Sequence, residues 1–158
     1  MTKFLFAFLF LFGINNGFAQ KTANEQALKD LIQNSFDDIF SAHNKESVSN
    51  YYTDDFLLLE AGVVWNIDSV NYYLDRAKIR TQKVERVNSF DFFQVKIKGK
   101  RGWIAYQNYA DIIIDGKVVS KLHWLESGTA IKTKRGWRLD MLHSTRVKDL
   151  SYNVSKNH

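Results

Sequence analysis

Two hydrophobic patterns divide the sequence into a helical first part and a strand-rich second part. Between residues 22 and 43 the apolar positions recur at steps of three and four, which predicts one apolar stripe along a helix of about five turns. Thr22 and Glu25 have the spacing of a capping box at its start. The stripe consists of Leu28, Leu31, Ile32, Phe36, Ile39 and Phe40.

A second amphipathic helix is predicted to begin at Asn66 or Asp68, since both residue types are good N-caps. Between the two helices we expect a shorter helical stretch at about 46–52 and short strands at 56–59 and 63–65, with Gly62 as the turn. The inner face of the second helix is formed by Val70, Tyr73, Leu74 and Ala77.

Long strands follow, at about 84–98 and 103–114 and as the two arms of a hairpin from 117 to 147. Asp115-Gly116 is a type I′ hairpin signal, and Lys134 to Gly136 form the last turn. Helices that precede a meander of hairpins are typical of an α+β fold, and they have one sheet face on which to bury their stripes. We therefore predict N-terminal helices packed on a strongly bent antiparallel sheet, with an interior pocket.

The first residues have the pattern of a cleaved signal peptide. Lys3 precedes an apolar run that is shorter than the ~20 residues of a membrane span, and small residues stand at 17 and 19. We expect cleavage after Ala19, export to a periplasm or the medium, and no membrane attachment afterwards; the alternative is an uncleaved anchor. The predicted organisation is a signal peptide at 1–19, one domain at 20–147 and a polar tail at 148–158.

The composition excludes several kinds of functional site. The sequence has no cysteine, which excludes disulfides and thiolate sites. Its net charge of +5 is scattered over turns and strand ends, a pattern that favours solvated turns over a nucleic-acid surface. The four histidines have no short ligand spacing, and no glycine-rich phosphate loop occurs. We expect no metal and no cofactor.

His143 and Glu126 are candidates for chemistry on the last hairpin. His143 shares one face of its strand with large apolar residues, so we expect it to point inward. If Thr133 pairs with Gly136, Glu126 lies opposite His143; a slip by one residue places it opposite Ser144 on the other face. An inward pair forms either an acid–base dyad or a structural pair. The apolar residues on that face are Trp137, Leu139 and Met141.

The order of the elements and three short motifs resemble one known superfamily. The motifs are Asp54-Asp55-Phe56 before the first strand, the Asp115-Gly116 hairpin, and Gly136-Trp137-Arg138-Leu139 with Leu142-His143-Ser144-Thr145 at the end. Over about residues 23–147 the chain is similar to the nuclear transport factor two-like superfamily, which includes SnoaL-like cyclases and ketosteroid isomerase. The resemblance implies a cone-shaped α+β fold. It leaves the activity open, because this fold carries many functions.

The same resemblance implies roles for single residues. Glu60 stands at the position of the general base of ketosteroid isomerase, although a strand-end glutamate facing water is the alternative. His123 lies near the position of that enzyme's second aspartate. The stretch 36–40 lacks the tyrosine of its oxyanion hole, which argues against steroid-type isomerisation.

Two functions therefore remain open. The first is an exported domain that binds a small, largely apolar molecule without catalysis. The second is a cofactor-free isomerase, dehydratase or hydrolase with Glu60, Glu126 and His143 as its acid–base residues. Homodimers formed through the sheet are expected by analogy with the superfamily. The predicted ligand-binding residues are Trp65, Tyr109, His123 and Trp124.

Overall fold

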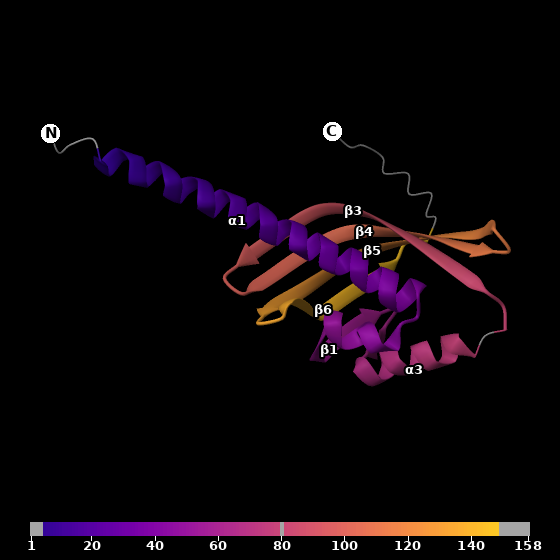
Figure 1. Cartoon of the computed structure of the whole chain (residues 1–158). Helices are drawn as coiled ribbons and strands as arrows, with labels where there is room; N and C mark the ends of the chain where they lie inside the picture. Colours follow the sequence, from indigo (N-terminus) through magenta and orange to yellow (C-terminus); the bar gives the residue numbers. More distant parts are fainter. Residues whose placement is uncertain (1–4, 80, 149–158) are drawn as a thin grey trace, which may run out of the picture.

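The chain begins with one long helix. The computed structural model describes residues 5–79 and 81–148, with side chains from residue 20 onward. Helix α1 (Leu5–Ser35) continues into a π-helix (Phe36–Ser41), and together they cross one face of the sheet (Figure 1). The prediction that this helix begins at Thr22 is wrong for the full chain, because the backbone of residues 5–19 is also helical. In the described part of the chain, no helix is both long and apolar enough to cross a membrane.

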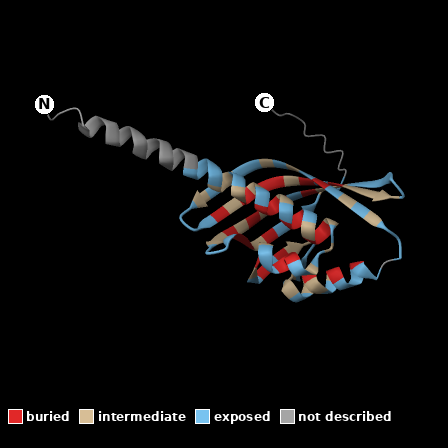
Figure 2. Cartoon of the chain, in the orientation of Figure 1, coloured by how far each residue is buried: buried red, intermediate tan, exposed pale blue. Residues whose placement is uncertain are grey.

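The predicted apolar stripe of this helix is confirmed. All six of its residues are buried, and Figure 2 shows buried positions along the helix where it crosses the sheet. The helix lies so close to the sheet that a Cβ atom at Gly102 would come within 2.5 Å of Leu28 Cδ1. Glycine at 102 therefore sets the distance between helix and sheet.

The remaining helices are short. A 3₁₀-helix (Lys45–Ser47) and α2 (Val48–Tyr51) lead into the first strand, and α3 (Ile67–Lys78) packs beside it (Figure 1). Of the two predicted caps, Asn66 is the N-cap of α3. Its Oδ1 accepts a hydrogen bond from the Ser69 amide at 3.0 Å, and Ser69 Oγ accepts one from the Asn66 amide at 3.3 Å.

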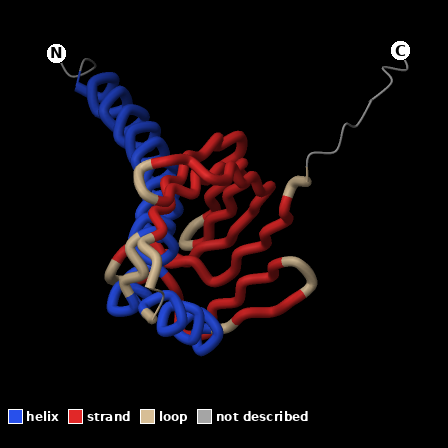
Figure 3. Tube along the Cα trace, turned by 90° about the vertical axis from the view of Figure 1, so that its right-hand side faces the viewer, coloured by secondary structure: helices blue, strands red, loops and turns tan. Residues whose placement is uncertain are grey.

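Six strands form one curved, open sheet (Figure 3). They are β1 (Tyr52–Glu60), β2 (Val63–Trp65), β3 (Val84–Lys98), β4 (Arg101–Ile114), β5 (Lys117–Thr133) and β6 (Gly136–Arg146). Their order is β2-β1-β6-β5-β4-β3, and neighbours are antiparallel except for β1 and β6, which are parallel. We call the face that meets α1 the inner face and the opposite one the outer face. The predicted α+β class is confirmed.

A bulge in β6 changes which residues face inward. The predicted pairing of Thr133 with Gly136 is confirmed, and Ala130 then pairs with Leu139. The next residue of β5, Thr129, pairs with Met141, so Asp140 is an extra residue in β6. Because side chains alternate between faces, one extra residue exchanges the faces for the rest of the strand.

Candidate functional site

The bulge separates the predicted pair of Glu126 and His143. Glu126 is opposite Ser144, while His143 is opposite Ser127 and is exposed on the outer face. The prediction of an inward Glu126–His143 pair is therefore wrong. Its starting register was correct, but the extra residue Asp140 moves every later residue of β6 by one position.

Glu126 is a buried carboxylate on the inner face. It is 6% exposed, Ser144 Oγ donates a hydrogen bond to its Oε1 at 2.9 Å, and Asn108 Nδ2 donates one to its Oε2 at 3.3 Å. Burial raises the pKa of Glu126 to about 7, and the hydrogen-bond donors and the Arg86 charge only partly oppose this rise. Both the protonated and the ionised form of Glu126 are therefore accessible near neutral pH.

Polar atoms without a hydrogen-bond partner surround this carboxylate. Near it, the Tyr52 hydroxyl, the Tyr106 hydroxyl and Asn108 Oδ1 are three of the buried atoms that have no hydrogen-bond partner among the described residues, although the Tyr52 hydroxyl lies close to Ser35. The Tyr106 hydroxyl lies close enough to lower the pKa of Glu126, although its geometry falls short of a hydrogen bond. Buried polar groups are nearly always paired, so this cluster has unused capacity for water or a ligand.

A small enclosed cavity lies beside Glu126. Its volume is about 30 Å³, which is room for about two water molecules at 10–15 Å³ each. Glu60 lines the same cavity, so the structure brings together two of the three residues predicted for acid–base chemistry. The lining residues are Phe36, Phe40, Leu58, Glu60, Arg86, Trp124, Glu126 and Leu142.

Arg86 closes this cavity from β3 and was not among the predicted site residues. Its guanidinium lies over the rings of Trp124, Phe40 and Phe36, at 4.9, 5.6 and 5.8 Å from their centroids. Burial lowers the pKa of Arg86, and the charges of Glu126 and Glu60 act in the opposite direction. Side chains alternate between the two faces of a strand, so residues 86, 88, 90 and 92 of β3 share the inner face. This alternation is the sequence signal that could have identified Arg86.

The predicted ligand-binding residues are distributed over three places. Trp124 is buried and lines the cavity, with the Arg146 guanidinium 4.6 Å from its ring centroid. His123 and Tyr109 stack on each other on the outer face, with ring centroids 4.4 Å apart, and His123 contacts Gln107. Trp65 is half-buried beside Tyr73 near α3. The structure therefore brings only Trp124 to the interior.

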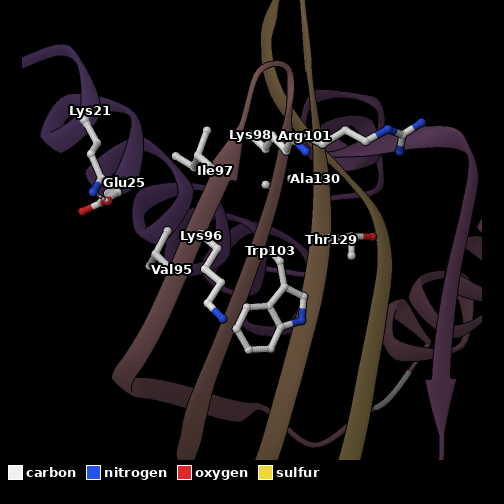
Figure 4. A pocket seen from close by; sticks show the side chains of 11 residues that line it. Lys21, Glu25, Val95, Lys96, Ile97, Lys98, Arg101, Trp103, Thr129 and Ala130 are labelled. Atoms are coloured by element: carbon white, nitrogen blue, oxygen red, sulfur yellow. Dashed lines mark ion pairs between the residues drawn. The ribbon is translucent and has the colours of Figure 1, made fainter. Parts of the chain in front are cut away.

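Larger hollows lie elsewhere and hold none of the buried acid–base groups. One of about 630 Å³ lies between α1 and the ends of β3, β4 and β5, where Figure 4 shows Lys96 beside the Trp103 indole. Another, of about 550 Å³, lies between β2 and α3 and is lined by Trp65. Both are open surface grooves. The interior cavity around Glu126 is therefore the stronger candidate site, although it is the smaller one.

The arrangement of helices over a curved sheet has many counterparts among solved structures. A CamKII hub homology domain from Chlamydamonas reinhardtii superposes with a TM-score of 0.68 at 19% identity, covering 80% of this chain and 99% of that one. An NTF2-like protein with a cystatin-like fold from Novosphingobium aromaticivorans gives a TM-score of 0.68 at 12% identity, covering 86% and 90%. The chain has the nuclear transport factor two-like fold.

A third counterpart shares this nuclear transport factor two-like fold. It is a ketosteroid isomerase-like protein from Erwinia carotovora atroseptica, with a TM-score of 0.56 at 14% identity, covering 79% of this chain and 94% of that one. No protein-family model and no curated protein matches the sequence. At these identities the likeness shows the fold alone, and the fold carries many functions. The function therefore depends on the site and not on the fold.

Proposed function

We propose that this chain binds a small molecule in the interior cavity beside Glu126. The observation that carries the proposal is the buried Glu126 carboxylate in a cavity that is lined by Glu60, Arg86 and five apolar side chains. A few convergent polar groups in an apolar pocket are typical of small-molecule sites. At about 30 Å³ the cavity has room for water but not for an organic ligand, so binding requires side chains that line it to move apart.

Acid–base catalysis in the same cavity is the second candidate. The observation that favours it is the pKa of Glu126 at about 7, which suits a group that both accepts and donates a proton near neutral pH. Glu60 supplies a second carboxylate in the cavity. His143 has no part in this version, because it lies on the outer face.

Mass spectrometry of small molecules that co-purify with the native protein tests the binding proposal. We expect a retained molecule in the wild type and in His143→Ala, and its loss in Glu126→Leu. Thermal unfolding confirms that both variants are folded. A wild type without any retained molecule, or equal retention in Glu126→Leu, would contradict the proposal.

We also propose that the protein is exported and that it pairs with a second copy through the outer face. The outer face carries exposed apolar side chains at Leu57, Val87, Tyr109 and Leu125, and Leu125 is 49% exposed. One of the similar structures is a hub homology domain. Light scattering after size exclusion should give a dimer mass, and Leu125→Glu should reduce it to a monomer. Tyr72→Glu, an exposed position on α3, is the matched control.

A further inference from the structure

We propose that the ligand of the interior cavity is a small carboxylic acid and that Arg86 binds its carboxylate. The proposal rests on the proposed function, because it names the chemistry of the molecule that the same cavity takes. It goes beyond that function by assigning recognition to a residue outside the predicted acid–base set.

Arg86 has one end of its guanidinium occupied and the other end available. Its Nε donates to Asn88 Oδ1 at 2.8 Å, and Asn88 Nδ2 in turn donates to Ser41 Oγ at 2.8 Å. Within the described part of the chain, no carboxylate oxygen lies within 4.0 Å of Arg86, and its two Nη groups have no protein acceptor. The two Nη groups match the two oxygens of a carboxylate, so the fork is oriented and free for bidentate binding.

The surroundings of this fork select an acid with a compact apolar part. Phe36, Phe40 and Trp124 cover the guanidinium but offer no hydrogen-bond acceptor to its Nη groups. An ion pair shielded in this way is stronger than one in water. The same rings line the cavity, so an aryl or short alkyl group would contact them once the cavity has opened.

The charge of the cavity depends on the protonation of Glu126. The charged groups that line the cavity are Arg86, Glu60 and Glu126: with Glu126 neutral, Arg86 and Glu60 balance, whereas with Glu126 ionised the lining carries one net negative charge, which opposes an anion. Burial places the pKa of Glu126 at about 7, so the neutral form is available below that pH. The titratable and charged groups around this site are Tyr52 and Glu60 of β1, Tyr73 of α3, Arg86 of β3, Tyr106 of β4 and Arg146 of β6; the π-helix contributes the apolar rings of Phe36 and Phe40.

Isothermal titration calorimetry with benzoate and its neutral analogue benzamide tests the assignment. At pH 6 we expect benzoate to bind at least about tenfold more tightly than benzamide. Arg86→Gln should lower the affinity for benzoate by about 10- to 100-fold, as expected for the loss of a charged hydrogen bond. The affinity for benzamide should stay within about twofold of the wild-type value. Lys134→Gln makes the same charge change in the exposed β5–β6 turn and should leave both affinities unchanged.

A pH series separates this proposal from a purely structural role of Arg86. Between pH 6 and 8.5 the affinity for benzoate should fall by about tenfold or more, because binding takes place with Glu126 protonated. Glu126→Gln should retain the affinity at pH 8.5. Arg86→Lys keeps the charge without the fork, so it should weaken benzoate by several-fold, and it serves if Arg86→Gln does not fold.

Equal affinity for benzamide and benzoate, or no effect of the Arg86 variants, would overturn the carboxylate assignment and leave ligand binding intact. Binding of neither probe would also overturn the assignment. The proposed function is decided separately, by the co-purified molecule.

Discussion

Glu126 has an unusual acidity because of where β5 places it. The strand alternates, so Glu126 shares the inner face with Trp124, Gly128 and Ala130, all of them buried. Desolvation disfavours the charged form, and two hydrogen-bond donors are too few to restore it. The residue type alone, a glutamate in a strand, predicts none of this.

The raised acidity has a consequence for stability. The folded pKa of about 7 lies above the ordinary value of 4.5, so the unfolded chain binds fewer protons than the folded one between these pH values. Stability should be greatest below pH 4.5 as far as this group is concerned, and should fall by about 3 kcal/mol as the pH rises through 7. Glu126→Gln should remove that fall. Urea unfolding at pH 5 and pH 8 measures this loss of unfolding free energy. If Glu126→Gln loses as much stability between these pH values as the wild type does, Glu126 is not the group responsible.

Ser144 and His143 should respond differently to truncation. Ser144 donates to the buried Glu126, so Ser144→Ala should cost about 1–2 kcal/mol of unfolding free energy. His143 is exposed, so His143→Ala should change it by less than about 0.5 kcal/mol. Denaturant unfolding at pH 8 compares the two. A larger loss for His143→Ala would mean that β6 has no bulge.

At the scale of elements, the bulge in β6 is the feature that could not be predicted from the sequence. The turn at residues 133–136 could be predicted from its own residues, and the predicted pairing of Thr133 with Gly136 is confirmed. The extra residue Asp140 could not be predicted in this way, because its position depends on other strands. Thr129 Oγ1 donates a hydrogen bond to Asp140 Oδ1 at 2.6 Å, and Arg101 Nη1 lies 3.5 Å from Asp140 Oδ2. Contacts between strands decide the face of every later residue in β6, including the predicted dyad.

The packing of α1 on β4 is the second element-scale feature that can be tested. A Cβ atom at residue 102 would clash with Leu28, so Gly102→Ala should destabilise the fold by about 1–3 kcal/mol. In a Leu28→Ala background the added methyl group has space, and the same change should cost clearly less. Additive costs in this double-mutant cycle would contradict the close approach of helix and sheet.

At the scale of the whole molecule, the fold was more predictable than the site. Helix stripes, hairpin turns and the order of elements are local signals, and they led to the α+β class that the structure shows. The site depends on residues from β1, β3, β5 and β6 that meet only in the folded chain. Glu60 and Glu126 were predicted and do share a cavity, whereas Arg86 and the small size of that cavity needed the structure.

The start of the mature protein is a prediction that concerns the whole chain. We expect the exported protein to begin at Gln20, since small residues at 17 and 19 fit a signal-peptidase site. Thr22 then stands near the new helix start, with Glu25 at capping-box spacing. N-terminal sequencing of the exported form decides this. A chain that retains Met1 in the membrane fraction would support the uncleaved anchor instead.

Everything proposed for the cavity depends on Glu126 being a buried acid on the inner face. A ¹³C NMR titration of its side-chain carboxyl group measures this most directly, with Glu126→Gln to assign the signal. We expect a midpoint near 7, unchanged in His143→Ala and higher in Ser144→Ala, because Ser144 stabilises the charged form. A midpoint at the ordinary 4.5, or one that shifts in His143→Ala but not in Ser144→Ala, would contradict the site.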